Sequence, residues 1–207
     1  MPVGVWNIAN ALTGLRLLLV PVFWVLLMHQ DGTDRGWRTA AFAVFAIAAL
    51  TDRYDGELAR RRGLVTDIGK IADPIADKAL IGAALIGLSV LGDVSWWVTV
   101  IVLVREVGVT VLRLVVIRHG VIAASRGGKT KTLLQTVAIG LYILPLGGVL
   151  HGIAAMVMAV AVVVTVVTGV HYVARAAALR RTSDLTVRRR ALRERSRADR
   201  DRASEAG

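Results

Sequence analysis

The sequence contains no cysteine, which excludes disulfide bonds and thiolate metal sites but leaves the redox compartment open. Internal repeats and low-complexity linkers are also absent, so nothing separates off a second folded domain. The first apolar segment has no basic residue before it and no small-x-small cleavage site after it, and Arg16 lies inside it. A secretory signal peptide has a basic region before its apolar segment and a cleavage site after it. We therefore expect this segment to remain as a helix.

Apolar side chains make up 55% of the 207 residues, more than a soluble domain of this size normally carries. A helix needs about 20 predominantly apolar residues to cross the roughly 30 Å hydrocarbon core of a bilayer. Runs near this length occur at residues 12–28, 38–54, 74–92, 95–117, 132–150 and 152–174. The sequence therefore predicts an all-α integral membrane protein with six transmembrane helices.

Basic residues are scarce in the loops that follow the odd-numbered predicted helices. Of the 26 Lys and Arg residues, only Arg35 and Arg38 fall in such a loop. Lys and Arg collect on the cytoplasmic side of membrane proteins. We therefore expect a multi-pass protein of the plasma membrane whose two termini and residues 51–78 are cytoplasmic.

The tail after Arg175 carries ten arginines and five acidic residues, so it contributes +5 of the chain's net charge of +11. This tail mixes basic and acidic residues without an apolar stripe, which is typical of a solvated, partly disordered segment attracted to anionic headgroups. We therefore expect a membrane domain over 1–178 and a basic cytoplasmic tail over 179–207. No aromatic residues interleave with the arginines as stacking platforms, which argues against nucleic-acid binding.

One strongly charged stretch, TDRYDGELARRRGLVTDIGKIADPIADK at 51–78, interrupts this apolar chain. Asp52 and Asp55 are three residues apart, and Asp73 and Asp77 four, so on helices each pair shares a face. Four carboxylates at the edge of hydrocarbon repel one another unless cations lie among them or some are protonated. Oxygen ligands without His or Cys suit Mg²⁺ or Mn²⁺. The stretch predicts a divalent metal site of two ions.

The residues between these pairs refine the prediction. Gly56 and Gly69 remove side chains where a ligand or another backbone comes close. Arg60 offers a planar donor fork to a phosphate. Asp73 precedes Pro74, which predicts that the third helix starts or kinks there.

Written as a pattern, the stretch is D-x2-D-G-x2-A-R-x8-G-x3-D-x3-D. This pattern resembles the signature of the CDP-alcohol phosphotransferase family, membrane enzymes that move a phosphatidyl group from a CDP-linked lipid to an alcohol. The stretches NIANALTGLRLLLVP, DPIADK, REVGVTVLR and GGKTKTLLQ resemble its phosphatidylglycerophosphate synthase branch. The resemblance extends over about 6–175. Ala9 and Lys70 depart from it, since relatives often have a proline and a small or apolar residue there.

The resemblance implies transfer of the phosphatidyl group of CDP-diacylglycerol to sn-glycerol 3-phosphate, giving phosphatidylglycerol phosphate and CMP. The transfer would be a metal-assisted direct displacement in a cytoplasm-facing cavity, and the enzyme a homodimer. The implied metal ligands are Asp52, Asp55 and Asp73, with Asp77 as the base and a further ligand. The implied CDP-lipid contacts are Asn10, Thr13, Gly56, Arg60 and Thr66.

A second cluster bears on the choice of acceptor. On one helix, Arg105, Glu106 and Arg113 fall within a sector of about 100°. Arg113 and Glu106 could pair, while Arg105, Lys129 and Lys131 could receive the acceptor phosphate. The predicted acceptor-phosphate residues are therefore Arg105, Arg113, Lys129 and Lys131. Snorkelling toward the headgroups remains the alternative for all four and is the main interpretation for Arg16, Arg118 and Arg126.

Two other functions remain open. The same chemistry could serve another acceptor, such as inositol phosphate. A cation-coupled transporter would also carry intramembrane carboxylates, but near the bilayer midplane and often in repeated halves. Here the carboxylates lie toward the predicted cytoplasmic ends, and no repeat is visible, so the sequence favours the enzyme.

Overall fold

The computed structural model describes residues 8–62, 67–116 and 126–205, with side chains described over 11–52, 75–112 and 131–178. Within these ranges the chain is all helical, with no strand. The helices are α1 (Ile8–Met28), η1 (His29–Gly32, a short 3-10 turn), α2 (Arg35–Arg62), α3 (Asp67–Val90), α4 (Trp96–Val116), α5 (Arg126–Ile143) and α6 (Val149–Glu205). The all-α prediction is confirmed for these residues, and each predicted apolar run lies mainly on a different one of the six α-helices.

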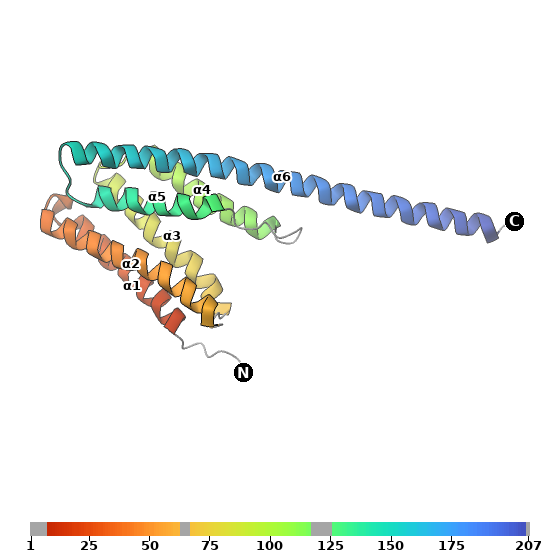
Figure 1. Ribbon diagram of the computed structural model, residues 1–207, viewed down its shortest axis with the longest axis horizontal. Coiled ribbons are helices and arrows are strands. Elements are labelled where there is room, and N and C mark those ends of the chain that lie inside the picture. The colour runs from red at the N-terminus through yellow and green to blue at the C-terminus, as the bar shows by residue number, and fades with distance from the viewer. Residues whose placement is uncertain (1–7, 63–66, 117–125, 206–207) are drawn as a thin grey trace.

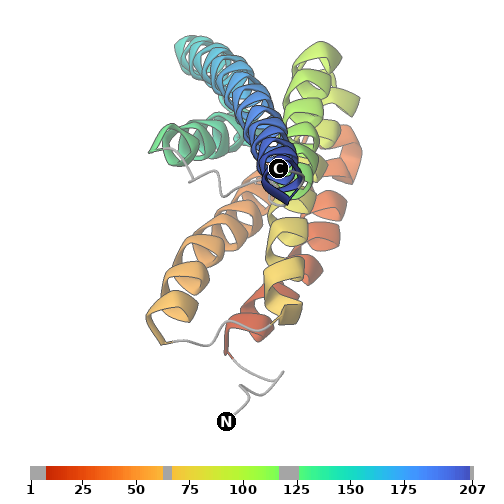
Figure 2. The same cartoon turned by 90° about the vertical axis from the view of Figure 1, so that its right-hand side faces the viewer.

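The helices pack in two groups that share one apolar core. α1 packs against α2 and α3, and α6 against α4 and α5, while α3 contacts both α4 and α5 and α2 contacts α5. Seen from the C-terminal end of α6, α4 and α5 lie on either side of it (Figure 2). The core draws buried side chains from every α-helix, including the Phe23 and Phe45 rings, whose centroids are 5.8 Å apart.

The outer faces of the helices also carry large apolar side chains. Examples are Leu18 on α1, Val104 on α4 and Val163 on α6, each more than half exposed. An apolar surface this extensive is typical of a protein that contacts lipid. Two segments, Ala11–Gly32 and Val149–Ala178, are long and apolar enough by themselves to cross a membrane among the described residues.

The connections α1–α2, α3–α4 and α5–α6 lie at one end of the bundle (Figure 1). Arg38 joins them there, because its guanidinium donates to the Asp93 carboxylate at 2.5 Å and to the carbonyls of Gly32, Tyr142 and Ile143. The end of η1 lies close to Leu91, the residue that follows α3. Gly32 has φ +65° there, and a Cβ on it would lie 2.5 Å from Leu91 Cδ1, so this position favours glycine.

Two boundaries differ from the sequence expectations. α3 begins at Asp67, so the helix does not start at Pro74, and the alternative of a kink at Pro74 stays a prediction. α6 continues as one helix to Glu205 and projects beyond the bundle, where a solvated, partly disordered tail was expected (Figure 1). The Ala, Leu, Arg and Glu that dominate this segment are strong helix formers, which accounts for the helix. The domain boundary at 178 stays a prediction.

Candidate active site

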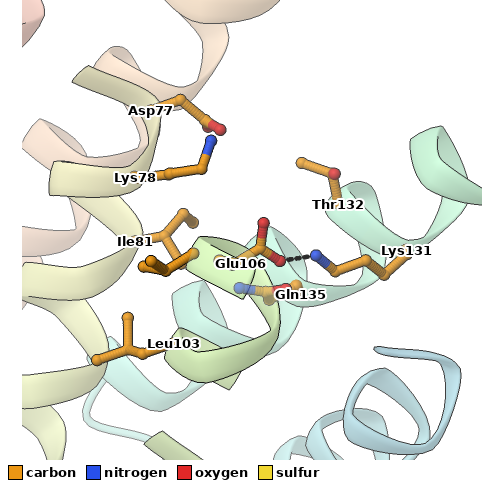
Figure 3. A pocket seen from close by; sticks show the side chains of 9 residues that line it. Asp77, Lys78, Ile81, Leu103, Glu106, Lys131, Thr132 and Gln135 are labelled. Carbon is orange, nitrogen blue, oxygen red and sulfur yellow. Dashed lines mark ion pairs between the residues drawn. The ribbon is translucent and has the colours of Figure 1, made fainter. Parts of the chain in front are cut away.

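A cavity of about 80 Å³ lies between α3, α4 and α5. Its polar lining consists of Asp77, Lys78, Glu106, Lys131, Thr132 and Gln135 (Figure 3). Each helix contributes lining residues four positions apart, such as Asp77 and Ile81 or Lys131 and Gln135, because this spacing places side chains on one helical face. The cavity therefore joins one carboxylate of the charged stretch to a lysine of the GGKTKTLLQ segment.

Glu106 and Lys131 form an ion pair across this cavity (Figure 3). Lys131 is only 2% exposed, so it does not snorkel toward the surface, and its charge depends on a carboxylate partner. Arg105 Nη1 also lies 3.4 Å from Glu106 Oε1. Sequence analysis suggested Arg113 as the partner of Glu106, whereas in the described residues Glu106 pairs with Lys131 and Arg105.

Arg105 is directed toward α6 rather than into the cavity. Its Nη2 donates to Thr168 Oγ1 at 3.2 Å, and its aliphatic stem packs over Gly169. Of the four predicted acceptor-phosphate residues, Lys131 thus lines the cavity, whereas Arg105 contacts Glu106 and Thr168. The side chains of Arg113 and Lys129 lie outside the described residues.

Arg16 was assigned mainly to snorkelling, and this interpretation is wrong. Its side chain is fully buried, and Nη1 donates to Asp52 Oδ1 at 2.5 Å. The Asp52 side chain on α2 is 39% exposed. An arginine nine residues into an apolar helix is costly unless it is paired, and the neighbouring α2 supplies the partner. Arg16 therefore orients one of the predicted metal ligands.

The other predicted lipid contacts are described only in part. Thr13 is buried on α1, one turn before Arg16 and on the same face. Asn10, Gly56 and Arg60 lie on described helices, but their side chains do not belong to the described residues, and Thr66 lies outside them altogether.

The predicted metal site falls on the facing helices α2 and α3, which contact each other. Asp52 and Asp77 are described, whereas the side chains of Asp55 and Asp73 are not. Among the described side chains, no group of three or more His, Cys, Asp or Glu gathers in a way that could hold a metal. The four-carboxylate site therefore stays a prediction. The donor chemistry fits a hard divalent cation, because Asp52 and Asp77 both offer partly exposed carboxylate oxygens.

Sequence reasoning missed four polar residues near this site, of which Thr132 is one more residue of the cavity lining. Lys78 and Gln135 line the cavity, and Arg16 pairs with Asp52. The spacing of Gln135 from Lys131 could have identified it, since both fall on one face of the same helix. An arginine inside an apolar run was also a signal, because such residues have a functional role by default.

Comparisons with known proteins bear on what this site does. Residues 6–167 match the family model described as CDP-alcohol phosphatidyltransferase. A Mycobacterium tuberculosis protein named "Probable phosphatidylglycerophosphate synthase" is 61% identical over 170 residues, which cover 82% of this chain and 81% of that protein. A Bacillus subtilis protein named CDP-diacylglycerol–glycerol-3-phosphate 3-phosphatidyltransferase is 37% identical over 180 residues, covering 81% and 93%. An Escherichia coli protein of the same name is 38% identical over 141 residues, covering 65% and 75%.

Proposed function

Because the chain belongs to the CDP-alcohol phosphatidyltransferase family, we propose that it transfers the phosphatidyl group of CDP-diacylglycerol to sn-glycerol 3-phosphate. The products are phosphatidylglycerol phosphate and CMP. Membership of this family makes the chain a phospholipid-synthesising transferase, and the printed names of its relatives favour glycerol 3-phosphate over inositol phosphate as acceptor.

The cavity is the observation that carries this proposal. An acceptor that bears both a hydroxyl and a phosphate needs a base for one and cations for the other. Asp77 on α3 and Lys131 on α5 line the same cavity and supply these two groups. Its volume of about 80 Å³ suits part of a small polar acceptor rather than a nucleotide lipid. A transporter would not need this combination.

The displacement requires no covalent intermediate. Asp77 accepts the proton of the primary hydroxyl as that oxygen bonds to the lipid phosphorus, and the bond from phosphorus to the CMP oxygen breaks in line. Arg60 donates to the phosphates of CDP-diacylglycerol, with Asn10, Thr13, Gly56 and Thr66 completing the pocket for this lipid. Lys131 binds the acceptor phosphate, with Arg105, Arg113 and Lys129 as the further predicted cations.

The metal site would be formed by Asp52, Asp55, Asp73 and Asp77, with two Mg²⁺ or Mn²⁺ ions. Divalent ions bound there would neutralise the pyrophosphate and the charge that develops on departing CMP. The chain's own contribution is orientation, because Arg16 fixes the Asp52 carboxylate from the neighbouring helix.

We also propose that all six α-helices cross the plasma membrane, with both termini and the cavity on the cytoplasmic side. The apolar outer faces of the helices support this proposal. It is also supported by the position of the α1–α2, α3–α4 and α5–α6 connections at one end of the bundle. The scarcity of basic residues in these connections supports the orientation. A homodimer is proposed from the family resemblance alone.

The test is release of CMP from CDP-diacylglycerol by detergent-purified protein in Mg²⁺, with a panel of acceptors. We expect turnover with sn-glycerol 3-phosphate and little with inositol phosphate or glycerol. Asp52→Ala and Asp55→Ala should weaken CDP and metal binding, while Asp31→Asn, an exposed carboxylate at the other end of the bundle, should not. Turnover with inositol phosphate alone would contradict the acceptor, and normal CDP binding by Asp52→Ala would contradict the metal site.

A further inference from the structure

Gln135 carries a buried polar atom that the proposed chemistry does not use. The residue is 3% exposed, and among the described residues its amide oxygen Oε1 is buried without a hydrogen-bond partner. Nearly all buried polar atoms in folded proteins have a partner, because leaving one unpaired is costly. Gln135 also lines the cavity, so a group that enters the cavity could supply the missing partner.

The surroundings of Gln135 define what that group is. Gln135 lies one turn after Lys131 on α5, beside the Glu106–Lys131 pair, and Asp77 lies on the α3 side of the cavity (Figure 3). An amide oxygen accepts hydrogen bonds and donates none. A deprotonated phosphate oxygen has no proton to donate and cannot satisfy it, whereas a hydroxyl can. A neutral amide also cannot take a proton, so the hydroxyl it binds is one that does not react.

We propose that Gln135 is a specificity-determining residue whose amide oxygen accepts a hydrogen bond from the non-reacting secondary hydroxyl of the acceptor. This inference rests on the proposed function, with the acceptor phosphate at Lys131 and the reacting primary hydroxyl at Asp77. The secondary hydroxyl lies between those two groups in glycerol 3-phosphate, and Gln135 lines the same cavity as both residues. A site built to hydrogen-bond a hydroxyl rejects an analogue that lacks it, because its own polar group is then left unpaired.

The test uses propane-1,3-diol monophosphate, which keeps the phosphate and the primary hydroxyl of glycerol 3-phosphate and lacks the secondary hydroxyl. The ratio of kcat/KM for the two acceptors is measured by CMP release with wild type and with Gln135→Met, which preserves length and removes the acceptor atom. Wild type should prefer glycerol 3-phosphate by about tenfold to a hundredfold, the range expected for one hydrogen bond to a buried group. Gln135→Met should bring the ratio close to one while its rate with the analogue changes little.

Two controls keep the outcome clear. Thr136→Val alters the next residue of α5, which does not line the cavity, and should leave the ratio as in wild type. Gln135→Glu retains an acceptor oxygen and should retain the preference, even though its charge weakens phosphate binding. Equal use of both acceptors by wild type overturns the inference without any variant, as would an ordered water that satisfies the amide. A wild-type preference that survives in folded Gln135→Met also overturns it. If wild type does not use glycerol 3-phosphate at all, the proposed function itself fails, which is a distinguishable result.

Discussion

The Arg16–Asp52 pair links the first helix to the charged stretch through two side chains. Arg16 is fully buried, while Asp52 is partly exposed and predicted to bind metal. Removing the arginine takes this cation and its hydrogen bond away from Asp52. The cost should therefore appear in ligand binding as well as in stability, which separates this pair from a purely structural one.

We predict that Arg16→Met lowers kcat/KM for CDP-diacylglycerol by at least about tenfold, since a hydrogen bond to a charged group contributes roughly 1.5 to 3 kcal/mol. Arg16→Lys should recover part of this loss, because it restores the charge without the planar fork. Kinetics at several Mg²⁺ concentrations would check this, with Arg16→Met expected to require more Mg²⁺. Unchanged Mg²⁺ dependence in a folded variant would reduce the pair to a structural role.

Asp77 gives a second prediction for a single side chain. Asp77→Asn should lower turnover by about a hundredfold or more, because an amide keeps the shape of the carboxylate but cannot act as a base. Binding of CDP-diacylglycerol should largely survive, and a CDP-binding assay beside CMP release would show both. If Asp77→Asn turns over at a near-normal rate, another group takes the proton.

The sequence predicted some of these residues and not others for a physical reason. Asp52, Asp55, Asp73 and Asp77 follow helical spacing within one short stretch, so local geometry was enough to pair them. The contact between Arg16 and Asp52 joins residues 36 positions apart, and no local rule predicts it. Gln135 is a neutral amide, so apart from its spacing from Lys131 only its buried, unpaired oxygen, which the structure reveals, draws attention to it.

At the level of helices, apolar run length predicted six segments that agree with the observed ones, but their ends depended on other effects. α5 ends at Ile143 because Pro145 and the Gly147–Gly148 pair follow, although the apolar run continues to 150. α3 extends back to Asp67 despite Pro74. The length of an apolar run shows whether a segment can cross a bilayer. The ends of a helix depend instead on backbone hydrogen bonding and on turn residues.

The ion pair between Arg38 and Asp93 connects helices at one end of the bundle. Their side chains are only 13% and 26% exposed, and Arg38 also donates to carbonyls from two other connections. We predict that Arg38→Met lowers the melting temperature in detergent by several degrees, since about 1 kcal/mol corresponds to roughly 2–4 °C in a domain of this size. Asp93→Asn should cost less, because the carbonyl contacts of Arg38 remain.

The same variants should spare catalysis in the protein that remains folded. Tyr142, which accepts from Arg38, lies eleven residues after Lys131 on α5, or about 16 Å along the helix. KM for both substrates should therefore stay near wild type below the melting temperature. A double-mutant cycle that shows no coupling between Arg38 and Asp93 would contradict a stabilising role for their ion pair. A large change in KM would show that this end of the bundle affects the cavity.

At the scale of the whole molecule, the structure and the charge distribution make separate statements about topology. The contacts of Arg38 place the α1–α2, α3–α4 and α5–α6 connections on one side, whichever side that is. The distribution of Lys and Arg supports the proposal that this side is the exterior. On this proposal the projecting C-terminal part of α6 would lie in the cytoplasm, where its positive charge would face anionic headgroups.

Because the native chain has no cysteine, single cysteines can test both statements in a fully active background. Thr33→Cys, Ser95→Cys and Gly147→Cys lie in or beside the three connections and are exposed, while Ser204→Cys lies near the end of α6. We predict that a membrane-impermeant maleimide labels the first three in intact spheroplasts and labels Ser204→Cys only after the membrane is opened. If the first three differ from one another, the helices do not all cross the membrane. If all three react only after opening while Ser204→Cys reacts at once, the bundle is correct but inverted, and the cavity then faces away from cytoplasmic glycerol 3-phosphate.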